Sequence, residues 1–436
     1  MNSRELTYKA LNKILINNQN CKSILMDYTN KYNLNSHEKQ LFYALTKGTI
    51  TRKIYLDYLI ELLNTNYNFN ISRNKFKNII RLGLFQLIYM NSIPDYAAVN
   101  ETVNLCKKHY IKELKSKVNA LLRVYLRNKN NFKLPQDPMQ KIAYEYSFPL
   151  HLIEDWMDDF GKKDTIKLCK YFNKTPELSV HFYGSDDEFE KFQQHLQKND
   201  IKFSLSKFFP KVIKINDTYN FRSDKFFKEG KYYIQDESTL LPVELLDIAE
   251  GEKILDLCAA PGGKTFNIAS KTKDLIFAND IDENRLKLLK DNTQRLDVEN
   301  LKILNKTITD FSPKNKFDKI LIDAPCSGYG VIQKKPEIRL KNKDNFKNLI
   351  QIQKKLLQNS ANILKENGVI VYSTCTMNRI ENEVQVEEFL NNNADFILEN
   401  PTNYVNSDFV KDDYVKTFPH IHNMDGSFAA RLRKKC

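Results

Sequence analysis

The sequence predicts a multidomain protein in which an all-α bundle precedes a small α/β module and a larger α/β domain. Three observations predict this order. Apolar residues recur at helical spacing in residues 1–130, a polar segment with two prolines follows, and beyond residue 246 strand patterns alternate with helical patterns. The 436 residues also suggest roughly three domains, at about 150 residues per domain.

The first predicted domain, residues 1–130, is helical and basic. It contains 21 Lys and Arg residues against 8 Asp and Glu, so it carries the whole net charge of +13 and the rest of the chain is neutral overall. Such a basic end predicts a polyanion-binding surface, although a lysine-rich solvated surface is the alternative. Its helical spacing is clear from the first residues onward: Leu6, Ala10, Leu11, Ile14 and Leu15.

The second region, residues 131–245, begins as a linker and continues as a small α/β module. The polar stretch NKNNFKLPQDP reads as the linker. Phe189–Gln197 is a candidate helix and Lys211–Ile215 a candidate strand. Trp156 is the single tryptophan, and its apolar neighbours favour a place in a core over stacking on a base.

The third region, residues 246–436, opens on the stretch KILDLCAAPGGKT, Lys253 to Thr265. A short apolar strand, a glycine turn and a helix in succession are typical of a Rossmann-type sheet that offers its backbone to a nucleotide-like ligand. Gly262 and Gly263 carry no Cβ, so a ligand can lie against the main chain. An ordinary strand-to-helix turn is the alternative for a glycine pair taken alone.

Two cysteine-containing stretches follow, ILIDAPCSGYG at 320–330 and GVIVYSTCTM at 368–377. Each is an apolar strand pattern that ends in a cysteine where the polarity changes. Because ligands of an open α/β sheet bind outside the carboxyl ends of the strands, we expect Cys258, Cys326 and Cys375 to face one crevice.

DLCAAPGGKT, DAPCSG and STC, in this order, resemble the motifs of the NOL/NOP/Sun (NSUN) family of RNA (cytosine-C5) methyltransferases. The front of the chain, RLGLFQLIYMNSIPDYAAVNETVNLCKK at 81–108, resembles the NusB fold. The whole chain is similar to the bacterial members that act on small-subunit (16S) ribosomal RNA. The resemblance implies a NusB-like RNA-binding domain at 1–130, an RNA-binding module at 131–245, and a catalytic domain at 246–436 with a seven-stranded sheet and one late antiparallel strand.

The resemblance also implies S-adenosyl-L-methionine as the cofactor. Its methionine part would lie along the turn formed by Cys258, Ala259, Ala260, Pro261, Gly262, Gly263 and Lys264. Asp280, at the end of the second strand, matches the position that takes the ribose hydroxyls, and Asp282 is expected to cap a helix instead. Asp323 belongs to the same cofactor site. The family's acidic residue near the adenine has no clear match, because Thr307 stands there and Asp310 follows nearby.

The chemistry explains why two thiols are needed. C5 of cytosine is a poor nucleophile until a thiolate adds at C6, and the C5 proton and the thiolate must both leave afterwards. In the family the cysteine matching Cys375 is the nucleophile and the one matching Cys326 assists breakdown of the adduct. Asp323 would hydrogen-bond the N3/N4 edge of the base. A buried structural cysteine is the alternative for Cys258.

Two rival functions stay open from the sequence. A DNA cytosine-C5 methyltransferase would use Cys326 as nucleophile, but the STC motif and the basic front favour RNA. A non-catalytic NusB-like RNA-binding or antitermination factor would not need either cysteine motif.

We further expect a monomer in the cytoplasm with no metal site and no membrane span. No apolar run reaches about 18 residues, and seven cysteines without a CxxC pair argue against a disulfide framework or a zinc ribbon. His420 and His422 lack carboxylate or cysteine neighbours, so a loop is expected there.

Overall fold

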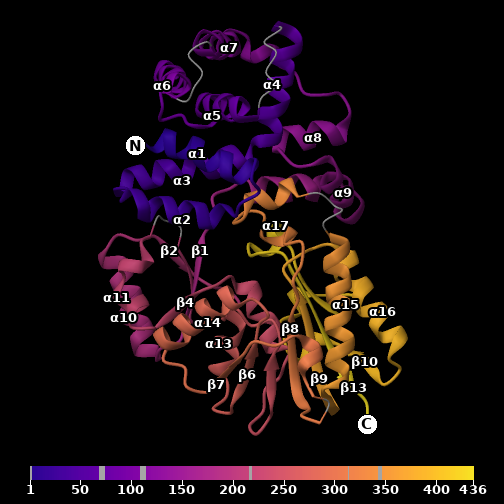
Figure 1. Ribbon diagram of the computed structural model, residues 1–436. Coiled ribbons are helices and arrows are strands. Elements are labelled where there is room, and N and C mark those ends of the chain that lie inside the picture. Colours follow the sequence, from indigo (N-terminus) through magenta and orange to yellow (C-terminus); the bar gives the residue numbers. More distant parts are fainter. Residues whose placement is uncertain (1, 68–73, 109–113, 216–218, 313, 342–345) are drawn as a thin grey trace. The chain divides into compact units, whose positions relative to one another are not determined.

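The computed structural model describes residues 2–67, 74–108, 114–215, 219–312, 314–341 and 346–436. The chain forms two compact units (Figure 1): unit 1 contains residues 1–174 and 332–341, and unit 2 contains residues 175–331 and 342–436. Unit 1 is therefore the helical unit and unit 2 the α/β unit. The sequence-based boundaries at 130 and 245 differ from this division, because residues 131–174 and a ten-residue segment from the catalytic region fold with the helices.

The helical unit consists of nine α-helices in the described ranges. They are α1 (Ser3–Leu15), α2 (Cys21–Tyr32), α3 (Ser36–Thr51), α4 (Lys53–Tyr67), α5 (Asn74–Tyr89), α6 (Asp95–Lys108), α7 (Lys115–Asn128), α8 (Pro138–Tyr146) and α9 (Leu150–Phe172). Local signals set their starts: Asn35 and Glu38 form a reciprocal capping box at α3. Helix α5 is buried on nearly every side, as expected for the central helix of a bundle.

Arg339 ties three parts of the helical unit together. Its side chain is buried, and Nη1 donates hydrogen bonds to the carbonyl oxygens of Thr51 and Ser147, at 2.9 and 3.0 Å, and to Oδ1 of Asn173 at 3.2 Å. The guanidinium lies 4.1 Å from the ring centroid of Phe148. Burial lowers the pKa of Arg339 to about 9. These contacts anchor residues 332–341 to the ends of α3, α8 and α9.

Trp156 lies in the core of the helical unit, as the sequence predicted. It is buried, and its ring centroid lies 5.3 Å from that of Phe148 and 5.8 Å from that of Phe172.

The α/β unit begins with a small antiparallel sheet in the order β2-β3-β1-β4. Its elements are β1 (Leu178–Phe182), α10 (Asp186–Lys198), β2 (Phe203–Leu205), β3 (Val212–Ile215), α11 (Lys225–Lys228) and β4 (Tyr232–Ile234). The predicted helix at 189–197 lies within α10, and the predicted strand at 211–215 corresponds to β3.

The large sheet follows the order β11-β12-β13-β9-β8-β5-β6-β7, and β10 also pairs with β13. Its strands are β5 (Ile254–Asp256), β6 (Ile276–Asn279), β7 (Leu301–Leu304), β8 (Phe317–Asp323), β9 (Leu364–Thr374), β10 (Phe396–Glu399), β11 (Val410–Lys411), β12 (Tyr414–Thr417) and β13 (Ser427–Lys434). Pairs within β5–β9 are parallel, and β13 is antiparallel to β9. Within the described residues this large sheet thus has nine strands where seven were expected, because β10 and β11 extend it beside β13 and β12.

Helices cover both faces of this sheet (Figure 1). α12 (Leu241–Glu244), α13 (Gly263–Ala269) and α14 (Glu283–Arg295) pack on one face, and α15 (Lys347–Asn362) and α16 (Glu383–Asn392) pack on the other. The short α17 (Pro419–His422) follows β12. Side chains of β8 alternate between two cores, since Ile320 and Ile322 pack with α15 and α16 whereas Leu321 packs with α12 and α13. This double burial explains why the strands read as continuous apolar runs.

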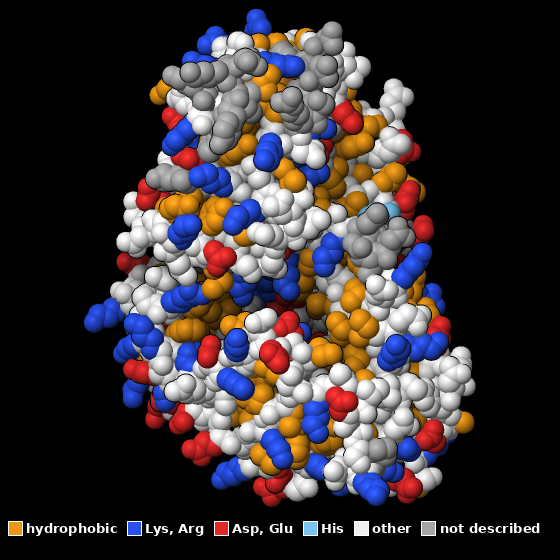
Figure 2. Space-filling view, in the orientation of Figure 1, with side chains coloured by type: hydrophobic (Ala, Val, Ile, Leu, Met, Phe, Trp, Pro, Cys, Tyr) orange, Lys and Arg blue, Asp and Glu red, His pale blue; other side chains and the backbone are white. Residues whose placement is uncertain are grey.

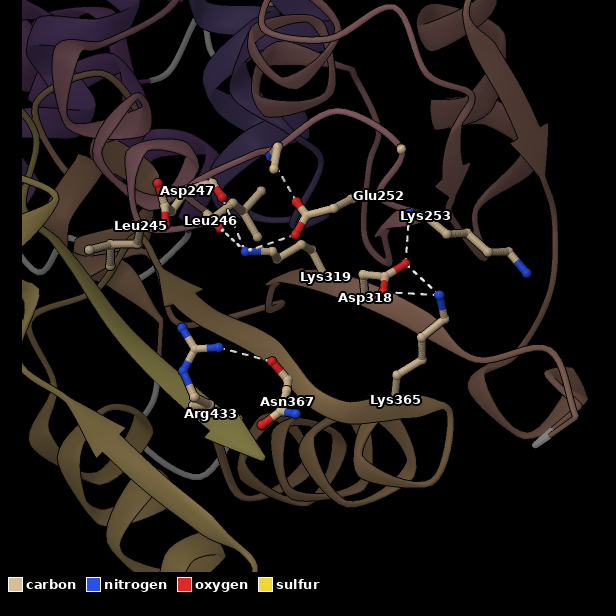
Figure 3. Close-up of polar contacts among 12 residues, drawn as sticks. Leu245, Leu246, Asp247, Glu252, Lys253, Asp318, Lys319, Lys365, Asn367 and Arg433 are labelled. Carbon is tan, nitrogen blue, oxygen red and sulfur yellow. Dashed lines mark hydrogen bonds and ion pairs between the residues drawn. The ribbon is translucent and has the colours of Figure 1, made fainter. Parts of the chain in front are cut away.

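Polar contacts fasten the loops at the amino ends of the parallel strands (Figure 3). The buried Lys319 donates from Nζ to the carbonyl oxygens of Leu246 and Asp247, at 2.9 and 3.1 Å, and pairs with Glu252 at 3.3 Å. Asp318 accepts from the backbone of Lys253 at 2.9 Å. The loop that leads into β5 is thereby held against β8. None of the helices in the described ranges has the length and hydropathy needed to cross a bilayer.

We expect Arg339→Ala to destabilise the helical unit by roughly 2–4 kcal/mol, because three acceptors at the ends of α3, α8 and α9 lose a buried, charged donor. Trp156 is the only tryptophan and lies beside Phe148, so its fluorescence during denaturant unfolding reports on this unit. The exposed Lys335→Ala is the control and should leave the transition unchanged. An Arg339→Ala transition that coincides with that of the unaltered protein would contradict the assigned role.

Candidate active site

The parallel pairing of β6, β5, β8 and β9 gathers four segments at one edge of the sheet. Asp256 pairs with Leu321, and Asp323 pairs with Ser373, so the carboxyl ends of these strands are aligned. Cys258, Asp280, Cys326 and Cys375 all follow strand ends on this edge. The strand register therefore places the three cysteine motifs after strand ends on one edge of the sheet, and a common crevice for them stays a prediction.

The glycine turn after β5 is built by backbone hydrogen bonds. The amide of Ala259 donates to the carbonyl of Asn279 at 2.7 Å, and Gly262 donates to the carbonyl of Ala259 at 2.8 Å. Gly262 has φ +113°, and a Cβ there would lie 2.3 Å from a ring carbon of Phe266. Both the backbone conformation and the close ring require glycine at this position.

Asp280 is buried beside this turn. Its Oδ2 accepts a hydrogen bond from the amide of Ala260 at 3.1 Å and pairs with Arg285 at 3.3 Å. Asp282 caps α14 by accepting from the amides of Asn284 and Arg285, which confirms the predicted cap. Arg285 was not identified from the sequence. The available signal was its position in the first turn of the helix that follows Asp280.

Asp256 is a second acidic residue that the sequence reading passed over. It ends β5, is fully buried, and accepts from Oγ1 of Thr265 at 2.7 Å, while its Oδ1 has no hydrogen-bond partner. Burial raises the pKa of Asp256 to about 7, and the charges of Asp323 and Asp280 act in the same direction. The rule that singled out Asp280, an acidic residue at a strand end, would also have found Asp256.

Asp323 is held between two groups. It forms an ion pair with Nζ of Lys264 at 2.7 Å and accepts from Oγ of Ser373 at 3.2 Å. Burial disfavours the charged form of Lys264. The charge of Asp323 and its hydrogen bond together have the larger effect, so the pKa of Lys264 lies above its usual value. The pair links the glycine turn to the end of β8.

The two motif cysteines are in contact. Sγ of Cys326 lies 3.2 Å from Sγ of Cys375, and the amide of Cys375 donates to Sγ of Cys326 at 3.3 Å. The thiol contact with Cys375, together with burial, raises the pKa of Cys326 well above its usual value, so Cys326 holds its proton. Burial likewise raises the pKa of Cys258, for which the structure gives no such sulfur contact.

A glycine contact locks the two cysteine loops together. The amide of Gly330 donates to the carbonyl of Cys375 at 3.0 Å, and Gly330 accepts from the amide of Gly426 at 3.0 Å. A Cβ on Gly330 would lie 1.8 Å from the carbonyl oxygen of Gly426, so the approach requires glycine.

The small sheet supports the glycine turn. Gln235, which follows β4, is buried and donates from Nε2 to His181 at 3.0 Å and to Oη of Tyr183 at 3.3 Å. Its Oε1 would lie 2.9 Å from a Cβ on Gly263, so the amide packs directly against the turn. Burial lowers the pKa of His181 to about 4, which keeps this imidazole neutral.

Asp310 is engaged in its own turn after β7. Its carboxylate accepts from the amide of Thr307 at 2.8 Å in a capping box, and hydrogen bonds from the side chain and from the backbone of Thr307 lower the pKa of Asp310. Further along the chain, His420 and His422 lie in the one-turn helix α17 where a loop was expected, and Nδ1 of His422 accepts from the amide of Phe418 at 2.8 Å.

Comparison with known proteins agrees with this architecture. Residues 243–433 match the family model described as 16S rRNA methyltransferase RsmB/F, and residues 1–127 match the NusB family. The chain is 32% identical over 457 aligned positions to the "Probable ribosomal RNA small subunit methyltransferase B" of Bacillus subtilis, covering 99% of this chain and 98% of that protein. The protein of the same name from Synechocystis is 33% identical, with 93% of each chain covered. The crystal structure of PH0851 shares the fold, with a TM-score of 0.80, 22% identity, and coverage of 100% and 99%.

We expect Asp256 to make the α/β unit less stable as pH rises. Because its folded pKa of about 7 exceeds its unfolded value near 4, its contribution is complete below pH 4 and is lost as pH rises to about 7. The loss is at most about 4 kcal/mol. Hydrogen exchange of the β5 amides between pH 4 and 8, corrected for intrinsic exchange, measures it.

Asp256→Asn is the matched variant, since an amide keeps the acceptor for Thr265 without titrating. Its stability should vary less over this pH range. Equal pH dependence in the two proteins would rule out the raised pKa.

Proposed function

Because the chain belongs to the RsmB/F family of 16S ribosomal RNA methyltransferases, and is thus an S-adenosylmethionine-dependent 16S rRNA (cytosine-C5) methyltransferase, we propose that it works through a covalent cysteine adduct at C6 of cytidine. The observation that carries the proposal is the 3.2 Å separation of the Cys326 and Cys375 sulfur atoms. Two thiols this close can act on the same pyrimidine ring.

The residues at the strand ends fit the cofactor. Gly262 cannot accept a side chain, the buried Asp280 suits ribose hydroxyls, and the unpartnered Oδ1 of Asp256 suits a positively charged group such as an ammonium. In this proposal the turn from Cys258 to Lys264, with Asp280 and Asp323, holds S-adenosylmethionine. When bound, the cofactor supplies an electrophilic methyl group to an activated C5.

The thiols divide the work in this mechanism. Cys375, as thiolate, forms the bond from Sγ to C6, which makes C5 nucleophilic. After methylation the C5 proton passes to a water molecule, the C5–H electron pair re-forms the C5–C6 double bond, and the Sγ–C6 bond breaks with its electron pair returning to Sγ, which restores the aromatic ring and the Cys375 thiolate. Cys326 retains its proton beside Cys375 and assists this release. The direction of the Cys326 pKa shift supports the assignment of Cys375 as the thiolate.

Asp323 orients the base in the same proposal. Its carboxylate accepts a hydrogen bond at the N3/N4 edge, while Lys264 fixes its position through the 2.7 Å ion pair. The target base must leave its stack to reach the thiols, so a single-stranded or loop cytidine is the expected substrate.

The helical unit supplies the attraction for ribosomal RNA. Lys and Arg side chains lie at many points on the face of this unit shown in Figure 2, with fewer acidic side chains between them. The excess of Lys and Arg over Asp and Glu in residues 1–130 supports a phosphate-binding role for this unit. The monomeric state and the cytoplasmic location stay predictions from the sequence.

We expect Asp280→Ala to weaken binding of S-adenosylmethionine by about tenfold to a hundredfold, because hydrogen bonds to a charged acceptor are lost. Isothermal titration calorimetry measures the affinity, with the exposed Asp291→Ala on α14 as control. Unchanged affinity in a folded Asp280→Ala protein would reject this contact.

The cysteine roles predict opposite outcomes for two variants. Cys375→Ser should lose turnover and form no covalent RNA complex, since a hydroxyl is far less ionised than a thiol. Cys326→Ser should still attack but stall at release, and so accumulate a protein–RNA adduct on denaturing electrophoresis. An adduct trapped by the Cys375 variant instead would reverse the roles and favour the DNA-type mechanism. Parallel assays with radiolabelled cofactor on 16S rRNA and on DNA test the substrate.

A further inference from the structure

Glu381 is a fully buried carboxylate outside the predicted site residues. It ends the short turn Arg379–Glu381 that follows β9, and its side chain is 0% exposed. Oε1 accepts from the amide of Ser327 at 2.8 Å and from Nε2 of Gln353 at 3.1 Å, and Oε2 accepts from Nδ2 of Asn378 at 3.2 Å. A buried charge is retained at a cost, which these three donors reduce.

Two of the three donors come from the two cysteine loops, and the third comes from α15. Ser327 directly follows Cys326, and Asn378 lies three residues after Cys375. Gln353 of α15 also donates to the carbonyl of Pro325 at 2.9 Å, so the residues on both sides of Cys326 are tied to Glu381 or to its partner. One carboxylate therefore connects the loop after β8 with the loop after β9.

The position of Glu381 is itself fixed. Oη of Tyr372, in β9, donates to the carbonyl oxygen of Glu381 at 2.7 Å. A second bridge, 2.8 Å between the hydroxyls of Ser327 and Thr376, joins the same two loops. The sulfur–sulfur distance of 3.2 Å is set within this frame.

Glu381 also acts on Cys326 through its charge. After the contact with Cys375 and burial, the negative charge of Glu381 is a further cause that raises the pKa of Cys326. The carboxylate thus favours the thiol form of Cys326 while it holds the loop.

We propose that Glu381 is a positioning residue that sets the distance between the two cysteines and keeps Cys326 as the proton-bearing partner. This inference rests on the proposed covalent mechanism, since it assigns Glu381 a role in the same site. Glu381 acts on the cysteine loops through Ser327, Gln353 and Asn378, which donate hydrogen bonds to its carboxylate.

Exchanging donor and acceptor between Asn378 and Glu381 tests whether Glu381 bridges the two cysteine loops. In Glu381→Gln the new amide NH₂ faces the NH₂ of Asn378, and we expect kcat for 16S rRNA methylation to fall about tenfold to a hundredfold with the KM for cofactor unchanged. Adding Asn378→Asp supplies an acceptor for the new NH₂ and can still accept from the amide of Ile380, as Asn378 does at 3.2 Å. The double variant should regain most of the lost kcat, and the single Asn378→Asp should be slow because two carboxylates then face each other.

Thiol titration distinguishes positioning from a general loss of structure. In a Cys375→Ser background, alkylation of Cys326 by iodoacetamide, followed by peptide mass spectrometry, should begin at lower pH in Glu381→Gln than with Glu381 present. The exposed Glu388→Gln on α16 is the control and should shift neither the alkylation profile nor kcat.

Wild-type kcat in Glu381→Gln, no rescue in the double variant, or an unshifted alkylation profile would each overturn the inference. Failure of the unaltered protein to methylate RNA would overturn the proposed function instead. The alkylation profile is independent of RNA and would still test the role of Glu381.

Discussion

The parallel pairing of β8 with β9 is the constraint on which the rest of the site depends. It aligns Asp323 with Ser373 and brings the loops that follow the two strands side by side. Cys326 and Cys375, 49 residues apart in sequence, meet at 3.2 Å because of this register. A shift by one residue would turn the side chains of one strand to the opposite core and separate the thiols. The buried alternation of Ile320, Leu321 and Ile322 between two cores makes such a shift costly.

The same sheet edge combines opposite electrostatic requirements. The acidic side chains at three strand ends lie around the glycine turn. Asp256, Asp280 and Asp323 each have a different electrostatic environment. Asp280 pairs with Arg285, Asp323 with Lys264, and Asp256 is buried with a raised pKa. Oδ1 of Asp256 is buried without a hydrogen-bond partner, which suits a cationic group of the cofactor. Beside them, the thiol of Cys326 keeps its proton.

One segment of the helical unit comes from a distant part of the sequence, within the catalytic region. Residues 332–341 follow the Cys326 loop by only a few positions, yet Arg339 is buried among the ends of α3, α8 and α9. The backbone carbonyls at those helix ends need donors, and a guanidinium can serve several at once. Periodicity analysis cannot find such a segment, because neither its length nor its pattern marks it as part of a helical bundle.

The sequence by itself determined the order of folds, the glycine turn, the strand-end cysteines and the capping role of Asp282, because these depend on local periodicity and on short motifs. The family resemblance added the cofactor and the substrate class, which the comparisons support. Only the tertiary structure determined four features: the extra strands beside β13 and β12, the hydrogen-bond acceptors of Arg339, the burial of Asp256, and the bridge that Glu381 makes between the cysteine loops. Each of these depends on contacts between residues distant in the chain, whose free energy comes from burial and strand register and therefore leaves no local pattern.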